Sequence, residues 1–410
     1  MNILYVCGDW GVPVRGDKGA SVHVREFVTA LARLGHRVMI LCANIGAGNP
    51  DPPAEVIEIR PEPAAATRDT AAHEWRVRPE PSEKMLRREL DHLAYSTAWP
   101  LSALTTLERR GFAPDVVYER FSLFFHGGAT LTAGLEVPYL LEVNAPLIEE
   151  QERHRGLRLK PIAELIQRRC FRQAAHCVVV SDAVRDYVEA AHASADVVCL
   201  PNGVDVSRFR PDVDAAVVRV RHHLGDHAVM GFVGSLKPWH GLDFLFDAMR
   251  SVVTDQDVDC RLLLVGQGPE FANAEGWASD PALRGRVVLT GRVPHADVPA
   301  YLAAMDFTVA PYVETDGFYF SPLKVMESLA CGRPVIAPAL GQLTEIVRDG
   351  ETGLLYPPGD RDGFVDRVRE LIGNPALRAT MALEARRDAM IRMSWDSVAE
   401  RTVALMTRAA

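Results

Sequence analysis

The sequence predicts an α/β protein made of two consecutive doubly wound units, each a parallel sheet with helices on both faces. Short apolar runs alternate with longer amphipathic segments, which is typical of parallel strands connected by helices. The same pattern restarts midway along the chain, which at 410 residues is long enough for two or three domains. The fold class is therefore expected to be two Rossmann-like domains in series.

The first unit is expected to open with a strand over Asn2–Cys7 and a helix over Ser21–Leu34, whose apolar residues share one face. Residues 49–81 are rich in proline, alanine and charge and predict a surface loop with one short strand at 55–59. A helix is expected over 83–109. Further strands are predicted at Arg37–Cys42, Asp115–Tyr118, Pro138–Val143, Cys177–Ser181 and Asp196–Leu200.

The second unit is predicted to begin after a turn-rich boundary near Asn202. Its expected strands are His227–Gly234, Arg261–Gly266, Arg286–Thr290, Phe307–Ala310 and Pro334–Ala337, with helices at Leu242–Val253 and Lys324–Ala330. We therefore assign residues 1–202 to an N-terminal domain and 203–390 to a C-terminal domain. A last helix follows a complete second unit, so residues 391–410 are expected to cross back onto the first domain.

Bulk properties exclude several classes of protein. The net charge of −9 argues against a nucleic-acid binder. Seven singly scattered cysteines favour reduced, buried thiols in a cytoplasmic protein over a disulfide framework or a zinc site. The first residues lack a cationic leader and predict a strand rather than a signal peptide. No apolar run approaches the roughly 18 residues of a membrane span, which leaves only peripheral contact with a membrane open.

A bound metal is not expected. Asp-x-Asp triplets, which can hold a metal–diphosphate complex, occur at Asp212–Asp214, Asp255–Asp257 and Asp257–Asp259. The last two fall between a helix and the strand that follows it, which is the wrong end of a parallel sheet for a ligand.

The first candidate site is the loop Gly11–Ser21 between the first strand and the first helix. Gly16 and Gly19 allow the backbone to approach a ligand closely, and a helix N-terminus offers free N–H groups to an anion. The loop does not read G-x-G-x-x-G, and the acid that follows such a loop in dinucleotide-binding folds is absent, which argues against a nicotinamide site. The alternative is an ordinary strand-to-helix loop.

The second candidate site is the loop that follows the first strand of the second unit. Open α/β sheets bind ligands at the carboxyl ends of their strands. Gly234, Ser235, Lys237 and His240 lie at this place and are suited to phosphate contacts. The alternative is a loop whose polar residues only face water.

The third candidate site is the segment Phe318–Pro334. Glu327 lies one helical turn beyond Lys324, so a carboxylate for ribose hydroxyls and an ammonium for a diphosphate can share one face. Ser321, Pro322 and Leu323 open this helix, where backbone N–H groups can hold oxygens. The alternative is a surface ion pair between the two charged residues.

These segments, taken in order, resemble family 4 glycosyltransferases of the GT-B fold. The matching pieces of the second unit are PNGVDVSRFRP, FVGSLKPWHG, LLLVGQGPE, VVLTGRVPHADVPAYLAAMD, SPLKVMESLACGRPVIA and EIVRDGETGLLYPPGD, and GASVHVREFVTALARLGHRV matches in the first unit. The resemblance implies two Rossmann-like domains facing each other across a cleft. It also implies a retaining transfer from a nucleoside diphosphate sugar, with the donor held mainly by the C-terminal domain and the acceptor by the N-terminal one.

Site residues follow from the resemblance position by position. Glu327 matches the glutamate that binds the ribose. Gly16 and Gly19 match the loop that faces the donor phosphate, and Val293, after Arg292, matches the segment whose backbone meets the base. No cofactor is implied, because the nucleotide sugar is a co-substrate; a UDP-sugar is the expected donor, and a small molecule, a saccharide or a lipid-linked sugar the expected acceptor.

This chain departs from the family pattern at three places. Ser235 and His240 stand where a diphosphate-binding arginine and lysine are usual, and Tyr319 stands where the first of two glutamates is usual. Glu142 or Asn144 takes the place of a histidine after the central strand of the N-terminal domain. We therefore consider Lys324, with Lys237 and a protonated His240 as alternatives, the replacement cation.

Two other functions stay open from the sequence. One is a GT-B enzyme of another reaction class, a nucleotide-sugar epimerase or a phosphorylase. The other is a sugar-nucleotide-binding protein without catalytic activity, which the departures at Ser235 and Tyr319 allow.

Overall fold

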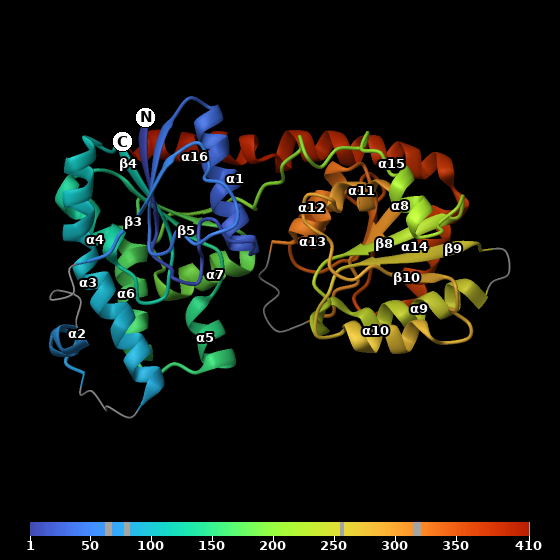
Figure 1. Ribbon diagram of the computed structural model, residues 1–410, viewed down its shortest axis with the longest axis horizontal. Coiled ribbons are helices and arrows are strands. Elements are labelled where there is room, and N and C mark those ends of the chain that lie inside the picture. Colours follow the sequence, from blue (N-terminus) through green and yellow to red (C-terminus); the bar gives the residue numbers. More distant parts are fainter. Residues whose placement is uncertain (62–67, 78–82, 255–257, 315–320, 410) are drawn as a thin grey trace. The chain divides into compact units, whose positions relative to one another are not determined.

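The computed structural model describes residues 1–61, 68–77, 83–254, 258–314 and 321–409. These residues form two compact units (Figure 1). Unit 1 comprises residues 1–202 together with the last helix, and unit 2 comprises residues 203–394. Tyr319, one of the departures from the family pattern, lies outside the described residues.

Unit 1 is built on a seven-stranded parallel sheet with the order β3-β2-β1-β4-β5-β6-β7. Its strands are β1 (Asn2–Cys7), β2 (Arg37–Cys42), β3 (Glu55–Glu58), β4 (Val116–Arg120), β5 (Tyr139–Val143), β6 (His176–Val179) and β7 (Val197–Cys199). Its helices are α1 (Gly19–Arg33), α2 (Arg68–Glu74), α3 (Lys84–Arg110), α4 (Gly127–Leu135), α5 (Leu147–Arg155), α6 (Lys160–Gln173), α7 (Asp182–Ala191) and α16 (Trp395–Ala409).

The central strands of unit 1 are buried on both faces, as expected for a parallel sheet covered by helices. Along β1, Ile3, Tyr5 and Cys7 point to the same side and share a core with α1 and α16. These two helices pack side by side on that face (Figure 1). The unit 1 core is therefore completed by residues from the far end of the chain.

Unit 2 is built on a six-stranded parallel sheet with the order β10-β9-β8-β11-β12-β13. Its strands are β8 (Ala228–Val233), β9 (Cys260–Val265), β10 (Val287–Leu289), β11 (Phe307–Val309), β12 (Val335–Pro338) and β13 (Gly353–Tyr356). Its helices are α8 (Ala216–Arg221), η1 (Pro238–His240), α9 (Leu242–Thr254), α10 (Phe271–Ala278), α11 (Val298–Ala303), α12 (Leu323–Ala330), α13 (Leu343–Ile346), α14 (Arg361–Gly373), α15 (Pro375–Asp388) and η2 (Ala389–Met393).

Each face of the unit 2 sheet has its own core. Met230 and Phe232 of β8 pack with α9 and α14 on one face. Val229 faces the other side, where α11, α12 and α15 cover the sheet. The predicted class of two Rossmann-like parallel-sheet domains is confirmed.

The chain returns to unit 1 at Trp395 rather than at residue 391. Met393 and Ser394 still belong to unit 2, because the backbone N–H of Val204 donates to the Met393 carbonyl at 2.7 Å and Val204 pairs with Ser394. Helix α2 lies within residues 49–81, which were expected to form a loop with one short strand.

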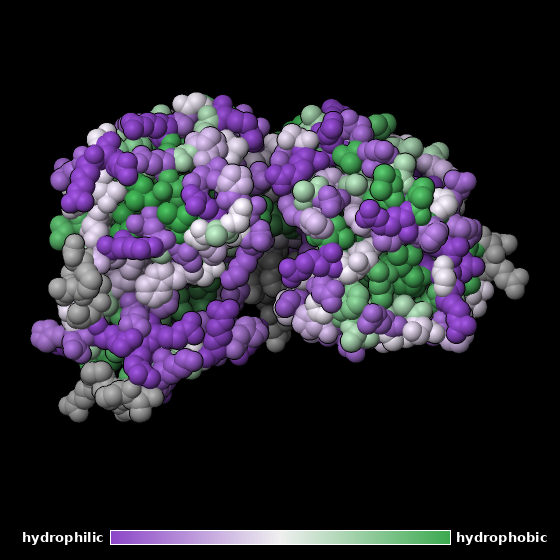
Figure 2. Space-filling view, in the orientation of Figure 1, coloured by the Kyte–Doolittle hydropathy of each residue, from purple (hydrophilic) through white to green (hydrophobic). Residues whose placement is uncertain are grey.

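The surface is chemically mixed. Figure 2 shows hydrophilic and hydrophobic residues interspersed over both units. In the described part of the chain, no helix combines the length and the apolar character needed to cross a membrane.

Candidate active site

The loops at the carboxyl edge of the unit 2 sheet are held together by backbone hydrogen bonds. The strand order reverses at β8, which is the switch point where open α/β sheets bind ligands. After β8, the N–H of Gly234 donates to the Val265 carbonyl at 2.8 Å. After β9, the N–H of Gly266 donates to the Gly291 carbonyl at 3.0 Å. The loops after β8, β9 and β10 therefore form one connected layer of backbone.

Glycine is required in this layer on steric grounds. Gly234 and Gly266 have φ angles of 152° and 144°, which side chains rarely allow. A Cβ atom on Gly266 would lie 1.8 Å from the carbonyl oxygen of Gly234. The two loops can therefore touch only because Gly266 carries no side chain.

Replacing Gly266 with alanine is expected to destabilise unit 2 by more than about 4 kcal/mol, because a backbone atom must move to admit the methyl group. The matched control is Gly276→Ala in α10, where a Cβ would meet no atom within 4 Å. That change is expected to stabilise the helix by up to about 1 kcal/mol. Denaturant titration of both variants measures the difference, and equal stabilities would show that the close approach is not a constraint.

Lys324 of α12 and His240 of η1 meet at this edge. The ammonium Nζ lies 3.3 Å from His240 Nε2. Because a protonated lysine only donates, the imidazole Nε2 must accept. The His240 ring is buried between Phe232 and Tyr312, with ring centroids 5.6 and 5.2 Å away.

The charges of the pair follow from this packing. Burial, and then the charge of Lys324, lower the pKa of His240 to about 3, so the ring is neutral at neutral pH. Burial lowers the pKa of Lys324 to about 8, although Glu327 acts in the opposite direction. Of the two, Lys324 is the cation, and His240 orients it. The protonated His240 that the sequence suggested is not what the structure favours.

The lysine head group lies directly over the β8 loop. A Cβ atom on Gly234 would lie 2.4 Å from Lys324 Nζ. Lys324 also lines a small cavity with Phe232, Thr308 and Tyr312, between β8 and β11, where the strand order reverses. A cation is thus placed at the switch point of the sheet.

Glu327, one turn further along α12, is paired with a residue other than Lys324. Its carboxylate oxygen Oε1 lies 3.3 Å from His295 Nε2, and its side chain is 16% exposed. Glu327 therefore contacts His295, while its charge still acts on Lys324 by raising the pKa of the lysine. Lys324 contacts His240 and Glu327 contacts His295, and both side chains lie at the edge of the sheet where ligands bind.

The other predicted donor residues surround this edge. Ser235 is exposed, and Lys237 lies over the Trp239 ring with its Nζ 5.7 Å from the centroid. Val293 packs against the unit 2 core. The start of α12 is formed by Ser321, whose buried hydroxyl has no hydrogen-bond partner among the described residues, by Pro322 and by Leu323.

In unit 1 the predicted glycine loop lies between β1 and α1. Gly16 is enclosed, because a Cβ there would lie 2.7 Å from Pro13 and 2.9 Å from the Ser21 hydroxyl. Its carbonyl accepts from Arg25 at 2.7 Å. Gly19 begins α1 and has open space around it. Of these two glycines, Gly16 is therefore the one that is required on steric grounds.

Glu142, at the end of β5, is buried in a polar cluster of unit 1. Its oxygens lie 2.5 Å from His23 Nε2, 3.4 Å from the Tyr5 hydroxyl and 3.8 Å from Arg120 Nη1. Burial by itself raises the pKa of Glu142, but His23, Arg120 and Asn144 outweigh it and hold the pKa at about 2. The Glu142 carboxylate is thus ionised, and His23, Tyr5 and Arg120 contact its oxygens.

The comparisons with known proteins bear directly on these two units. Residues 18–208 match the family described as Glycosyltransferase Family 4, and residues 227–374 match Glycosyl transferases group 1. The D-inositol 3-phosphate glycosyltransferase of Corynebacterium aurimucosum is 31% identical over 301 residues, which is 70% of this chain and 69% of that protein. The chain belongs to glycosyltransferase family 4. This predicted membership and the enzyme class are confirmed.

Two further similarities extend the comparison. The GDP-mannose-dependent alpha-(1-6)-phosphatidylinositol monomannoside mannosyltransferase of Mycolicibacterium smegmatis is 31% identical over 260 residues, or 62% of this chain and 67% of that protein. HepE of Anabaena, solved in complex with UDP, superposes with a TM-score of 0.71 at 18% identity and covers both chains completely. This last likeness supports the GT-B fold of the family 4 enzyme.

The partners of the two carboxylates were missed from the sequence. In unit 2 His295 contacts Glu327 and Arg208 contacts His295, and in unit 1 His23 and Arg120 contact Glu142. Arg120 is the charged last residue of the apolar strand β4, two positions beyond the predicted end of that strand. The partners of each carboxylate come from distant segments, so no local spacing could show them.

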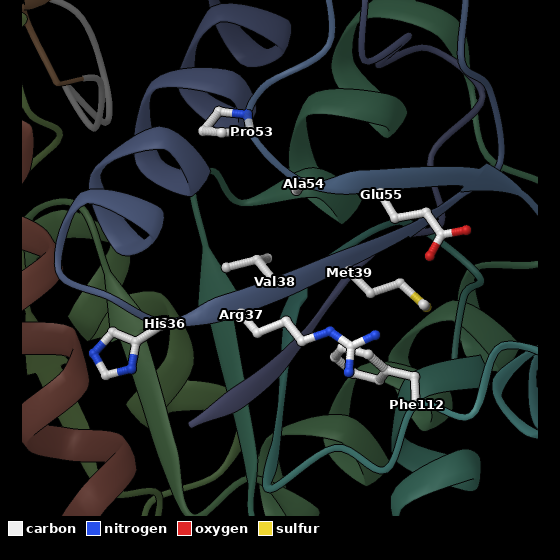
Figure 3. A pocket seen from close by; sticks show the side chains of 8 residues that line it. All are labelled: His36, Arg37, Val38, Met39, Pro53, Ala54, Glu55 and Phe112. Carbon is white, nitrogen blue, oxygen red and sulfur yellow. The ribbon is translucent and has the colours of Figure 1, made fainter.

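A pocket of unit 1 lies at the edge of its own sheet where strands begin. It has a volume of about 310 Å³ and is lined by His36, Arg37, Val38, Met39, Pro53, Ala54, Glu55 and Phe112 (Figure 3). The Arg37 guanidinium lies over the Phe112 ring at 5.0 Å from its centroid. These residues gather where β2 and β3 begin, whereas ligands of such sheets bind where strands end.

Proposed function

We propose that this glycosyltransferase moves a sugar, with retention of anomeric configuration, from a nucleoside diphosphate sugar held mainly by unit 2 to an acceptor bound mainly by unit 1. The observation that carries the proposal is the placement of Lys324 and Glu327 on successive turns of α12, at the carboxyl edge of the sheet, beside the glycine-built loop after β8. A cation for the diphosphate and a carboxylate for the ribose are thereby set one helical turn apart.

Lys324 is proposed to stabilise the leaving group. As the bond between the anomeric carbon and the phosphate oxygen breaks, its electron pair goes to the nucleoside diphosphate, which gains negative charge. The ammonium, held by His240, meets that charge without having to reorganise. The acceptor hydroxyl forms the new bond on the same face of the sugar, and its proton passes to the leaving phosphate oxygen.

The remaining predicted residues take supporting parts in this proposal. Gly234, Ser235 and Lys237 of unit 2 are proposed to contact the donor phosphates, and the loop of unit 1 that holds Gly16 and Gly19 is proposed to bind the same group. Ser321, Pro322 and Leu323 present the start of α12 to donor oxygens, and the backbone of Val293 meets the base. The Glu142 cluster, to which Asn144 belongs, is proposed to shape the acceptor side of unit 1.

Donor and acceptor are proposed by class. The expected donor is a UDP-sugar, and the name of the mannosyltransferase relative makes GDP-mannose the competing candidate. Both that relative and the inositol phosphate glycosyltransferase have polyhydroxylated, phosphate-bearing acceptors in their names. This supports a saccharide, a lipid-linked sugar or a small polyol as acceptor.

The proposal is tested by thermal shift with UDP, GDP, ADP and dTDP, followed by transfer assays with the matching nucleotide sugars. A nucleotide at 100 times its Kd adds about 2.7 kcal/mol to stability and raises the Tm. We expect UDP to give the largest shift and UDP-sugars to support transfer. A larger shift with GDP would reassign the base, and binding without turnover over a panel of sugar acceptors would overturn the proposal.

A further inference from the structure

Glu327 is reached by a chain of side chains that starts in the segment opening unit 2. Its Oε1 lies 3.3 Å from His295 Nε2. The other ring nitrogen of His295, Nδ1, lies 3.3 Å from Arg208 Nη1, and Arg208 Nη2 lies 3.4 Å from an oxygen of Asp205. Three side chains from two segments of unit 2 thus lead, one to the next, to the carboxylate proposed to bind ribose.

The chemistry of these partners fixes the state of the imidazole. A guanidinium only donates hydrogen bonds, so His295 Nδ1 must accept from Arg208. A neutral imidazole that accepts at Nδ1 carries its proton on Nε2, and that proton points at Glu327 Oε1. The ring is therefore a neutral donor to the carboxylate. It engages Oε1, and among the described residues no hydrogen-bond partner contacts the other oxygen, which can accept from two neighbouring hydroxyls.

The backbone around Asp205 and Arg208, which begin this row of side chains, is fixed by hydrogen bonds and packing. The Asp205 carboxylate accepts from the N–H groups of Ser207 and Arg208 at 3.0 and 3.2 Å, which closes a tight turn. Phe209 is buried in the unit 2 core, and its ring lies 5.6 Å from the His295 ring. Arg386 of α15 donates to the Phe209 carbonyl at 2.8 Å.

We propose that Arg208 and His295 are positioning residues that fix Glu327 for the ribose hydroxyls, so that the opening segment of unit 2 sets the preference for ribose over deoxyribose. This inference rests on the proposed function, because it assumes that Glu327 meets the ribose. An unheld glutamate would turn among several rotamers and lose entropy on binding. A glutamate that is already held loses less side-chain entropy when the ligand binds. Its full binding energy is gained only with a ligand that carries both ribose hydroxyls.

The binding test compares UDP and GDP with 2′-deoxy-UDP and 2′-deoxy-GDP by calorimetry. The wild-type protein is expected to prefer the ribonucleotide, and His295→Ala and Arg208→Ala to reduce that preference about tenfold, the size of one hydrogen bond to a charged group. His295→Gln keeps a donor in the place of Nε2 and should restore most of it. The control His222→Ala removes a half-buried unit 2 histidine that contacts Tyr301, and should leave the ratio unchanged.

Equal weakening of ribose and deoxyribose ligands in His295→Ala would overturn the proposal, since it would indicate a general structural role. An unchanged ratio would overturn it as well. Both changed side chains are partly exposed, at 45% and 38%, so the variants are expected to fold with a Tm near that of the wild type.

A second measurement is independent of the donor. Histidine ring ¹⁵N spectra of the nucleotide-free protein, assigned by the signal lost in His295→Gln, should show His295 with its proton on Nε2. Arg208→Ala should shift the ring towards a mixture of tautomers. A proton on Nδ1 in the wild type would disprove the proposed contacts among Arg208, His295 and Glu327, even if nucleotides bind. If the tautomer is as expected and neither diphosphate binds, the proposed function is wrong, and so is the role of Glu327 in binding ribose. The contacts among Arg208, His295 and Glu327 are then still confirmed.

Discussion

Replacing Lys324 with methionine is expected to lower sugar transfer about 10- to 1000-fold, the scale of removing one charge stabiliser from a transition state. Methionine keeps most of the volume beside Gly234 and His240, so the charge is the main change. Donor binding should weaken less than turnover, because the charge on the diphosphate is largest as the sugar leaves. Steady-state kinetics with the preferred nucleotide sugar separate kcat from KM.

Stability provides the internal check on this variant. The pKa of Lys324 is lower in the folded protein, at about 8, than in the unfolded chain, so between pH 8 and about 10.5 the unfolded state binds more protons. The stability of the wild type should therefore rise with pH through that window, and Lys324→Met should lack this rise. At pH 7 the variant should melt at the same or a higher temperature, because it no longer buries a charge.

The same pKa gives a pH profile for catalysis. If transfer needs the protonated ammonium, kcat/KM of the wild type falls above about pH 8, the value for the free enzyme. Lys84→Met, on the exposed surface of α3, is the control and should keep both rate and profile. A Lys324→Met enzyme with near-normal kcat would show that this lysine is only a structural neighbour of His240.

The pair at α12 illustrates what local sequence can predict. Lys324 and Glu327 were found from their spacing, and His240 from its place after the first strand of a restarting α/β pattern. Strand order then brings the two loops together, since the carboxyl ends of β8 and β11 meet at one edge. The 3.3 Å contact between Lys324 and His240 is the product of that topology. Residue spacing could not predict the protonation states of Lys324 and His240, because burial in the folded protein lowers the pKa of each.

The partners of the two carboxylates could not be predicted for a related reason. Glu142 stands where the family has a histidine, which suggested a catalytic part. Its surroundings come from α1, β1 and β4, and His23 lies 119 positions before it in the sequence. His295 likewise precedes Glu327 by 32 positions. Contacts over such separations depend on how helices dock on the sheet, which alternation of apolar and polar residues does not specify.

Replacing Glu142 with alanine is expected to destabilise unit 1 by about 3 to 5 kcal/mol, because His23 and Arg120 lose the buried carboxylate between them. Glu108→Ala, at an exposed position of α3, is the control and should change stability by less than about 0.5 kcal/mol. Denaturant midpoints at pH 7 compare the two variants.

The pH dependence of stability, together with the transfer rate, distinguishes a structural role of the Glu142 carboxylate from a catalytic one. The pKa of Glu142 is depressed to about 2 by its partners, so its stabilising effect is complete above the unfolded value near 4.5 and is lost as pH falls towards 2. Glu142→Gln should remove this contribution, so that its stability deficit against the wild type shrinks through that window. Its folded fraction, assayed at low temperature, should still transfer sugar within a few-fold of the wild-type rate. A Glu142→Gln enzyme with wild-type stability and no transfer would instead make this carboxylate a catalytic group, in the place that the family gives to histidine.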